Sequence, residues 1–173
     1  MAEQLQPAIE RFKSGDPAAF NEIVRAHQRD IYNLAYRMTG NRDEAKDLTQ
    51  DVFLRAYRAL PGFRGDSSLR TWLYRITINQ ANSWRRKLFK RPLPLADAEQ
   101  VAFHQNEDPG LALAVKRAVA ALPHKQRSVF VMHHYQGLKH EEIALVTDRT
   151  VGSVKANYFH AVEKLREQLK GYL

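Results

Sequence analysis

One stretch of the chain combines most of the excess positive charge with aromatic rings. Residues 64–91 contain eight Lys or Arg side chains and one Asp, a balance of +7, whereas residues 1–63 sum to zero and residues 92–173 sum to +1. Five aromatic residues lie inside or beside this stretch: Phe63, Trp72, Tyr74, Trp84 and Phe89. Because cations neutralise phosphates and flat rings stack on unpaired bases, the combination indicates a surface for single-stranded nucleic acid. The alternatives are a basic helix on an anionic membrane and a core helix with a charged outer face.

A second group of side chains suited to DNA lies near the C-terminus. The pattern predicts a helix-turn-helix, a motif whose second helix enters a major groove. It consists of a short helix with Leu138, Ile143 and Val146 facing inward, the tight turn TDRT and a longer helix from Val151. The face opposite the apolar stripe of that helix carries Ser153, Ala156, Asn157, His160 and Lys164, with Lys155 at its edge. An amide on this face can pair bidentately with adenine. An ordinary helical hairpin with a solvated face is the alternative.

Histidines near acidic residues suggest a third function, that of an enzyme. His133, His134 and His140 lie close to two glutamates, but the run HEExA lacks the second histidine of the HExxH zinc motif because Ala144 occupies its place. His133 and His134 are adjacent and therefore face different ways on a helix. The chain has no glycine-rich phosphate loop either. We therefore expect no catalytic site, no metal and no cofactor.

Composition restricts the compartment and the class of protein. The chain has 173 residues, of which 44% are hydrophobic, and it contains no cysteine. Disulfides and thiolate metal sites are therefore excluded. The N-terminal residues lack the basic start and apolar core of a secretory signal, and no apolar run approaches the length of about 18 residues that a membrane span needs. These features predict a cytoplasmic protein without membrane insertion.

Capping and stop signals predict a chain built of helices. Asp16-Pro17 is an N-cap followed by proline at the first helical position, Gly40 ends that helix, and Ser68 can cap a later one after the loop PGFRGDSS. The expected helices are 17–39, 42–60, 69–89, 110–122, 124–136, 139–146 and 151–170.

Residues 92–108 differ in composition from the sequence on either side. They contain four acidic residues, two prolines and no Lys or Arg, which is typical of a linker. A long loop within one domain is the alternative. We therefore predict an all-α fold of two small helical domains, 1–91 and 109–173, joined by a flexible linker.

Three motifs in order resemble the extracytoplasmic-function (ECF) group of bacterial RNA polymerase sigma factors. They are DLTQDVFLRAYRAL (Asp47–Leu60), FRGDSSLRTWLYRITIN (Phe63–Asn79) and GLKHEEIALVTDRTVGSVKANYFHAVEKLR (Gly137–Arg166), and the similarity covers about residues 8–172. The resemblance implies a region-two domain that binds core RNA polymerase and melts the proximal promoter element. It also implies a region-four helix-turn-helix domain that recognises the distal element in duplex DNA, so that the chain directs transcription initiation. A helix-turn-helix regulator that acts without polymerase is the alternative.

The resemblance also implies roles for individual residues. The core polymerase would bind Asp47, Gln50, Asp51 and Arg55, which share a polar helix face; a solvent face with an Asp51–Arg55 pair is the alternative. The single strand would be held by residues around a pocket for an extruded base and by cations along the backbone: Phe63, Arg64, Trp72, Tyr74, Asn79, Arg85, Arg86, Lys87, Lys90 and Arg91. For Trp72 and Tyr74, a place in the helix-bundle core is equally open.

The chain departs from the family pattern in region four. Asn157 and His160 occupy positions where arginines are common, and Lys139 stands where a serine N-cap is common. The family pattern therefore does not predict the preferred distal sequence, and we expect binding there to depend more on polymerase. The family analogy also implies an anti-sigma factor as a regulatory partner.

Overall fold

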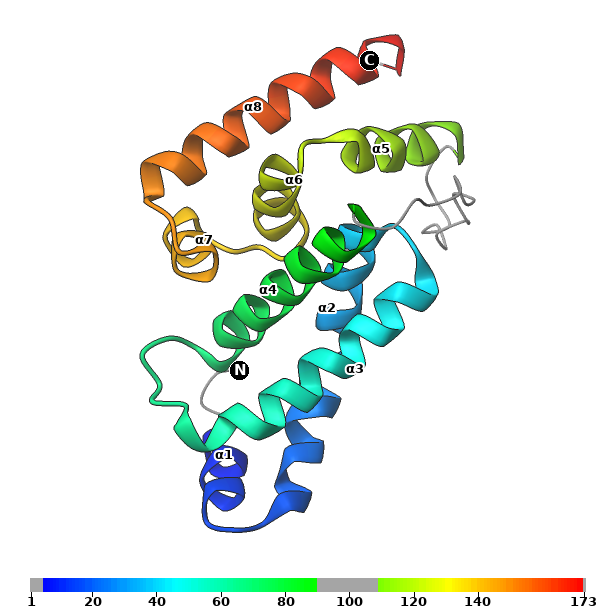
Figure 1. Ribbon diagram of the computed structural model, residues 1–173. Coiled ribbons are helices and arrows are strands. Elements are labelled where there is room, and N and C mark those ends of the chain that lie inside the picture. The colour runs from blue at the N-terminus through cyan, green and yellow to red at the C-terminus, as the bar shows by residue number, and fades with distance from the viewer. Residues whose placement is uncertain (1–4, 90–108, 173) are drawn as a thin grey trace. The chain divides into compact units, whose positions relative to one another are not determined.

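The protein is built of helices throughout the part of the chain that the computed structural model describes, residues 5–89 and 109–172 (Figure 1). It divides into two compact units, Met1–Pro94 and Leu95–Leu173. The expected all-α fold is confirmed. The predicted linker 92–108 lies outside the described residues, as do Lys90 and Arg91.

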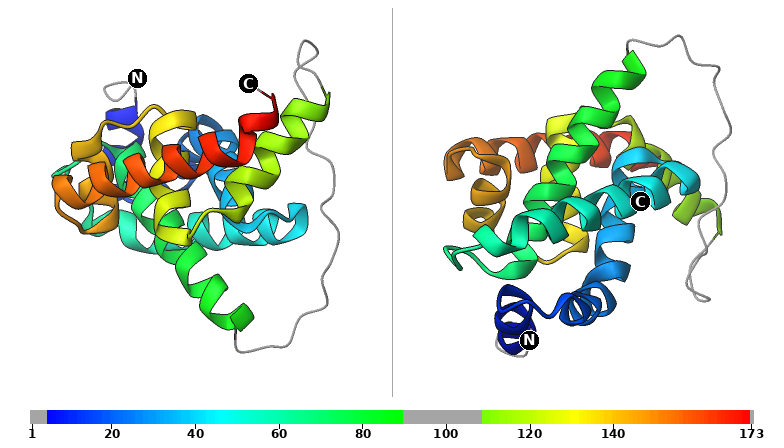
Figure 2. Two further views of the ribbon diagram at one scale, coloured as in Figure 1. Left: turned by 90° about the horizontal axis from the view of Figure 1, so that it is seen from above. Right: turned by 60° about the horizontal axis from the view of Figure 1, so that its bottom comes forward.

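The first unit is a bundle in which three long helices pack against one another in pairs. Its elements are α1 (Gln6–Lys13), η2 (Pro17–Ala19), α2 (Phe20–Thr39), α3 (Arg42–Ala59), η3 (Leu60–Gly62) and α4 (Leu69–Phe89). α4 crosses both α2 and α3, and α1 packs against α2 and η3 (Figures 1 and 2). The apolar faces of the long helices meet in a core that includes Ile31, Leu34, Val52 and Leu73, all inaccessible to solvent.

The start of the bundle differs from the expected helix 17–39. The Asp16 carboxylate caps this segment as predicted, accepting from the Ala18 N–H at 3.0 Å, but its first turn is the 3₁₀ turn η2 and α2 begins at Phe20. α1 was not among the expected helices; it has no side-chain cap and spans only eight residues. Ala8 and Ile9 bury its inner face against the bundle.

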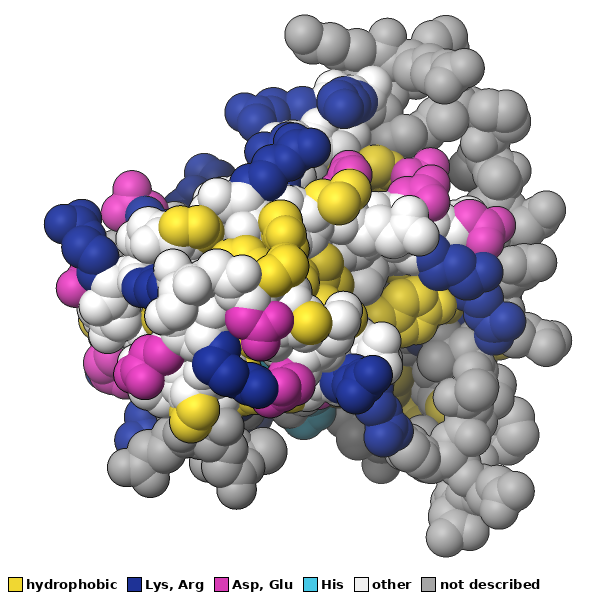
Figure 3. All heavy atoms as spheres, turned by 90° about the horizontal axis from the view of Figure 1, so that it is seen from below, with side chains coloured by type: hydrophobic (Ala, Val, Ile, Leu, Met, Phe, Trp, Pro, Cys, Tyr) yellow, Lys and Arg dark blue, Asp and Glu magenta, His cyan; other side chains and the backbone are white. Residues whose placement is uncertain are grey.

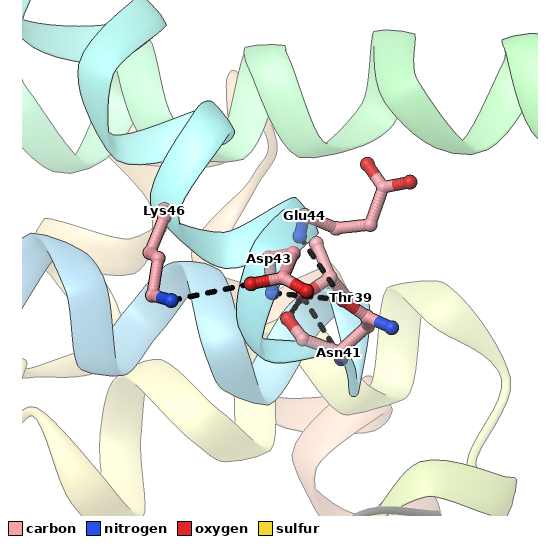
Figure 4. A network of polar contacts seen from close by, with 5 residues as sticks. All are labelled: Thr39, Asn41, Asp43, Glu44 and Lys46. Atoms are coloured by element: carbon pink, nitrogen blue, oxygen red, sulfur yellow. Dashed lines mark hydrogen bonds and ion pairs between the residues drawn. The ribbon is translucent and has the colours of Figure 1, made fainter. Parts of the chain in front are cut away.

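The predicted end of α2 and start of α3 agree with local capping chemistry. Gly40 ends α2 in the left-handed conformation, at φ 75°. Asn41 then caps α3, its Oδ1 accepting from the N–H groups of Asp43 at 2.9 Å and Glu44 at 3.0 Å (Figure 4). Thr39 Oγ1 donates to the Asn41 carbonyl at 3.1 Å, so a side chain from the end of α2 also holds the turn to α3. Lys46 forms an exposed ion pair with Asp43 on the first turn.

The second unit places one long helix across three shorter ones. Its elements are α5 (Pro109–Ala121), α6 (His124–Phe130), the π-helix η4 (Val131–Tyr135), α7 (His140–Thr147), α8 (Val151–Leu169) and η5 (Lys170–Tyr172). α8 packs against α5, α6 and α7 (Figure 1). The expected helix 124–136 changes to π geometry at Val131, where the Gln136 N–H donates to the Val131 carbonyl at 3.2 Å.

None of the helices in the described ranges is both long and apolar enough to cross a bilayer.

Candidate nucleic-acid interface

Two of the predicted single-strand residues, Phe63 and Trp72, lie side by side in the first unit. Their ring centroids are 5.2 Å apart at 51°, and both side chains are half-buried. Lys13 of α1 donates to the Phe63 carbonyl, and its ammonium lies 6.0 Å from the centre of the Phe63 ring. α1 and α4 therefore hold the loop that carries Phe63, and its ring keeps a partly exposed surface on which a base can stack.

Arg64 follows in the same loop and is largely exposed. Its Nε lies 3.8 Å from the Asp66 carboxylate, a surface pair too solvated to hold the guanidinium firmly. Arg64 therefore remains accessible to a phosphate.

The outward face of α4 carries a line of polar and cationic side chains. Asn79 is exposed, and Arg75 and Arg86 are exposed on the same side, four residues before it and seven after it. At about 1.5 Å per residue, the line from Arg75 to Arg86 extends over about 16 Å. The predicted cations Arg85 and Lys87 are also exposed beside it. Arg75 was not among the predicted site residues, although its spacing of four from Asn79 already placed both on one helix face.

Tyr74 lies in the core of the bundle, which corrects its inclusion among residues facing the single strand. Its side chain is inaccessible, and its hydroxyl accepts a hydrogen bond from Arg70 Nε at 3.1 Å. Burial raises the pKa of the Tyr74 phenol above its ordinary value, and the bond from Arg70 opposes this rise. A ring enclosed in this way cannot stack on a base, so the core alternative holds for Tyr74.

The second unit contains the predicted helix-turn-helix. Ile143 and Val146 of α7 and Val154 of α8 are buried where the two helices pack. Asp148 takes the left-handed conformation at φ 55° and ends α7. Thr150 caps α8, its hydroxyl accepting from the Ser153 N–H at 3.2 Å. Lys139 has no acceptor on its side chain, and the first turn of α7 is closed instead by Glu142, which accepts from the Lys139 N–H at 2.8 Å.

Most predicted distal-element residues lie on the solvent face of α8. Lys155, Ala156, His160 and Lys164 are exposed, whereas Ser153 and Asn157 are half-buried. The Asn157 amide nitrogen donates to the Ser153 carbonyl at 2.7 Å. This bond uses one of the two N–H donors of the amide, so the second N–H and the carbonyl oxygen are the groups left for a contact with adenine.

Phe159 is an additional candidate on the same face of α8. Its ring is 61% exposed, the largest value among the exposed large hydrophobic side chains of the described residues. It lies four residues after Lys155 and three after Ala156, so all three share one helix face. Phe159 was not among the predicted site residues, because an aromatic residue in a helix is usually part of a core.

The predicted protein-binding residues Asp47, Gln50 and Asp51 are exposed on α3, next to an apolar groove between α2 and α3. The groove has a volume of about 620 Å³, and Gln50 is one of its lining residues. Leu54 and Tyr57 also line it and are 57% and 42% exposed. On the face of the protein seen in Figure 3, hydrophobic side chains gather among charged ones. A polar rim beside an apolar centre is the usual composition of a protein–protein interface.

Arg55, the fourth predicted protein-binding residue, has a partner on α4. The Gln80 amide is assigned the orientation that turns its oxygen toward Arg55, because the guanidinium has only donors to offer; in that orientation Nη2 lies 3.2 Å from the oxygen and donates to it. No ion pair joins Asp51 to Arg55 in the described structure, so the alternative of a stabilising surface pair on α3 is not supported.

Two histidines of the second unit, His133 and His140, form a ring cluster with Tyr158. The His133 and His140 rings stack at 4.5 Å, and the Tyr158 ring packs edge-on against both. His133 Nδ1 is bonded to the Leu138 carbonyl at 2.8 Å, while His140 Nε2 is buried without a partner. Burial lowers the pKa of His140, with His133 and Lys155 adding to the effect and Glu141 opposing it. The described residues contain no group of three side chains placed to hold a metal ion.

Comparison with known proteins identifies one family over both units. Residues 23–91 match the family model for sigma-70 region 2, and residues 112–165 match the model for sigma-70 region 4. The chain is 35% identical to the RNA polymerase sigma-H factor of Pseudomonas aeruginosa, over 99% of this chain and 96% of that protein. It is 34% identical to the ECF RNA polymerase sigma-E factor of Escherichia coli K12, over 98% and 97% of the two chains.

Solved structures show the same similarity. The sigma factor RpoE of Bartonella quintana, in complex with the anti-sigma factor NepR, matches with a TM-score of 0.73 and 25% identity. That match covers 87% of this chain and 96% of the other. CnrH, in complex with the cytosolic domain of CnrY, matches with a TM-score of 0.70 and 23% identity over 95% and 96% of the two chains, which shows a shared fold.

Proposed function

The chain belongs to the ECF group of RNA polymerase sigma factors, and we propose that its two units divide promoter recognition between them. Residues 1–91 form region two, which docks on core polymerase and captures the melted proximal element. Residues 92–108 form the linker, and residues 109–173 form region four, which binds the distal element as duplex. The two compact units and the two matched family regions support these boundaries.

The region-two proposal rests mainly on one observation: Asn79 and exposed cations lie on the outward face of α4, the helix that also carries Trp72 of the Phe63–Trp72 pair. Extruding a base costs a few kcal/mol, and stacking it on an aromatic ring returns roughly 1–3 kcal/mol. One ring therefore cannot offset the melting of several base pairs. Exposed cations supply the additional binding through the DNA backbone. They are Arg64 in the loop and Arg75, Arg85, Arg86 and Lys87 on α4. Lys90 and Arg91 continue this basic segment in the sequence.

Within this face, Phe63 stacks on the extruded base and Asn79 reads its hydrogen-bonding edge. The Phe63 ring is held in place by Trp72 and Lys13, which lowers the entropy that it loses on binding. Asn79 is free to present both its amide donor and its acceptor, because it is exposed on the surface of a rigid helix. Trp72 contributes by supporting Phe63 and through its own half-buried ring.

Region four reads the distal element through α8. Lys155 and Lys164 contact phosphates, and base edges are approached by the face of α8 that carries Ser153, Ala156, Asn157 and His160. Phe159 adds an apolar contact of the kind that a thymine methyl group accepts. With Asn157 and His160 in place of arginines, this surface makes few charge contacts, so polymerase must help to hold it on DNA.

Core polymerase docks on the exposed side of α3. Asp47, Gln50 and Asp51 provide polar contacts, and the groove beside them accepts an apolar side chain through Leu54 and Tyr57. Buried apolar anchors contribute most of the affinity in typical interfaces, and the polar rim sets orientation.

An anti-sigma factor regulates the chain by covering its polymerase-binding surface. The similar RpoE of Bartonella quintana was solved with an anti-sigma factor bound. An exposed apolar groove between two helices is a surface that a partner segment can occupy in competition with polymerase.

The chain acts in the cytoplasm, where polymerase works, and it has no catalytic site of its own. It needs no metal or cofactor for this role. A stand-alone helix-turn-helix regulator is not favoured, because both family regions are present and nearly the whole chain aligns with sigma factors.

The test compares promoter opening with polymerase binding in Phe63→Ala and Asn79→Ala. Opening is followed by permanganate reactivity of unpaired thymines, and polymerase binding by fluorescence anisotropy of the labelled chain. We expect both variants to bind core polymerase normally and to open the promoter at least tenfold less. Equal loss of both activities, or loss of neither, would contradict the assignment.

A further inference from the structure

Two polar bridges connect α3, the proposed polymerase-docking helix, to α4, the proposed DNA-reading helix. The Arg55 guanidinium donates to the side-chain oxygen of Gln80. Toward the other end of α3, Glu44 accepts a hydrogen bond from the indole N–H of Trp84. Glu44 and Arg55 are eleven residues apart, close to three helical turns, so they lie on the same edge of α3.

Arg55 is directed away from the groove side of α3. At 100° per residue, Leu54 and Tyr57 lie on the groove side of α3, whereas Arg55 and Glu44 lie on the side of α4. Asp47 and Asp51 lie between these two edges. A guanidinium engaged with Gln80 is therefore less available to a protein docked on the groove than its place in the sequence suggests.

Gln80 is a buried polar side chain, exposed by 7%. A buried amide without a hydrogen bond is destabilising, and a guanidinium has only donors to offer it. Arg55 thus satisfies the Gln80 oxygen at a fixed point on α4. The next residue toward the N-terminus is Asn79, which is exposed. Because adjacent residues on a helix are rotated by about 100°, fixing Gln80 inward also fixes the direction in which Asn79 points outward.

We propose that Arg55 is a positioning residue for base recognition and not a polymerase contact. Through Gln80 it sets the rotation of α4 on α3, and so aims Asn79 at the extruded base while polymerase holds α3. The Glu44–Trp84 bridge restrains the same helix next to the cations Arg85 and Arg86. The inference rests on the proposed role of Asn79 in reading that base.

The test measures polymerase binding and promoter opening for full-length variants of both bridge partners. We expect Arg55→Ala and Gln80→Leu each to lower promoter opening by about tenfold, the value of one hydrogen bond to a charged group, while polymerase affinity stays within about twofold. The double variant should open the promoter no less than either single variant, because both remove the same bridge. Gln80→Glu retains an oxygen facing Arg55 and should preserve opening.

Controls separate this inference from loss of folding and from the proposed function itself. Arg29→Ala removes an exposed arginine of α2 that does not line the groove, and it should leave both activities unchanged. Weaker polymerase binding by Arg55→Ala, with normal behaviour of Gln80→Leu, would show that Arg55 is a polymerase contact and overturn the inference. Normal opening by Arg55→Ala while Asn79→Ala fails to open overturns the inference alone. Normal opening by Asn79→Ala overturns the proposed reading of the base and this inference with it.

Discussion

Replacing Tyr74 distinguishes a core residue from a DNA contact inside the aromatic motif. The side chain is inaccessible to solvent, so its truncation removes the whole of its contribution to the free energy of unfolding. An aromatic side chain buries about 150–250 Å², and at about 25 cal/mol per Å² this corresponds to about 4–6 kcal/mol. Measured aromatic-to-alanine changes in cores cost about 3–5 kcal/mol. We therefore expect Tyr74→Ala to remove at least about a fifth of the stability of a typical domain, which is about 5–15 kcal/mol.

Tyr74→Phe is the more informative variant because it keeps the ring and removes only the hydroxyl that accepts from Arg70. One such bond contributes about 1 kcal/mol. With a urea m-value of about 1–3 kcal/mol per M, the unfolding midpoint should fall by about 0.3–1 M. Promoter opening below that midpoint should stay unchanged.

Tryptophan fluorescence during urea unfolding is a suitable assay. Both tryptophans of the chain, Trp72 and Trp84, lie in the first unit, so the signal reports that unit. Tyr172→Phe, at an exposed position in the second unit, is the matched control and should not shift the midpoint. If Tyr74→Phe leaves the midpoint unchanged and impairs opening, Tyr74 contacts DNA and its assignment to the core is wrong.

Three further predictions concern the second unit and the groove. Phe159→Ala should weaken region-four binding to its preferred distal element by about 1 kcal/mol. On an element in which uracil replaces the contacted thymine, the methyl group is already absent, so the same variant should change binding little. Competition anisotropy with the polymerase complex measures both affinities. Leu54→Asp should weaken binding to core polymerase at least tenfold, because it places a carboxylate in an apolar groove. Leu145→Asp is the control: Leu145 is similarly exposed but lies outside that groove, so this variant should bind polymerase normally. The pKa of His140 is lower in the folded second unit than in the unfolded chain. Just below about pH 6.5, the unfolded chain therefore binds more protons than the folded one. The free energy of unfolding of the second unit should fall as pH drops through that value. His140→Gln should flatten this dependence in chemical denaturation followed by circular dichroism, and an unchanged slope would contradict it.

The sequence predicted the elements whose boundaries depend on local capping. Gly40 and Ser68 act at the expected places: Gly40 takes a left-handed conformation, and the Ser68 hydroxyl accepts from the Thr71 N–H at 3.1 Å. The buried positions Ile143, Val146 and Val154 followed from helical spacing alone. These features are encoded within a few residues of sequence, so reading them requires no knowledge of tertiary contacts.

The features that the sequence analysis missed depend on contacts between distant residues. α1 lacks a capping side chain and is stabilised by packing, with the Phe12 ring 5.0 Å from that of Tyr57. Tyr74 and Trp72 belong to one motif, yet only the fold shows that one is enclosed and the other partly exposed. In the same way, the partner of Arg55 is 25 residues away in the sequence, on a different helix.

The central claim is that one unit holds a separated DNA strand while the other binds duplex DNA, both in the service of polymerase. Run-off transcription with purified core polymerase on a promoter library tests it most directly. We expect transcripts only when this chain is added, from promoters that share a distal and a proximal element at fixed spacing. Stable association with core polymerase that starts no transcript from any promoter in the library would contradict the claim.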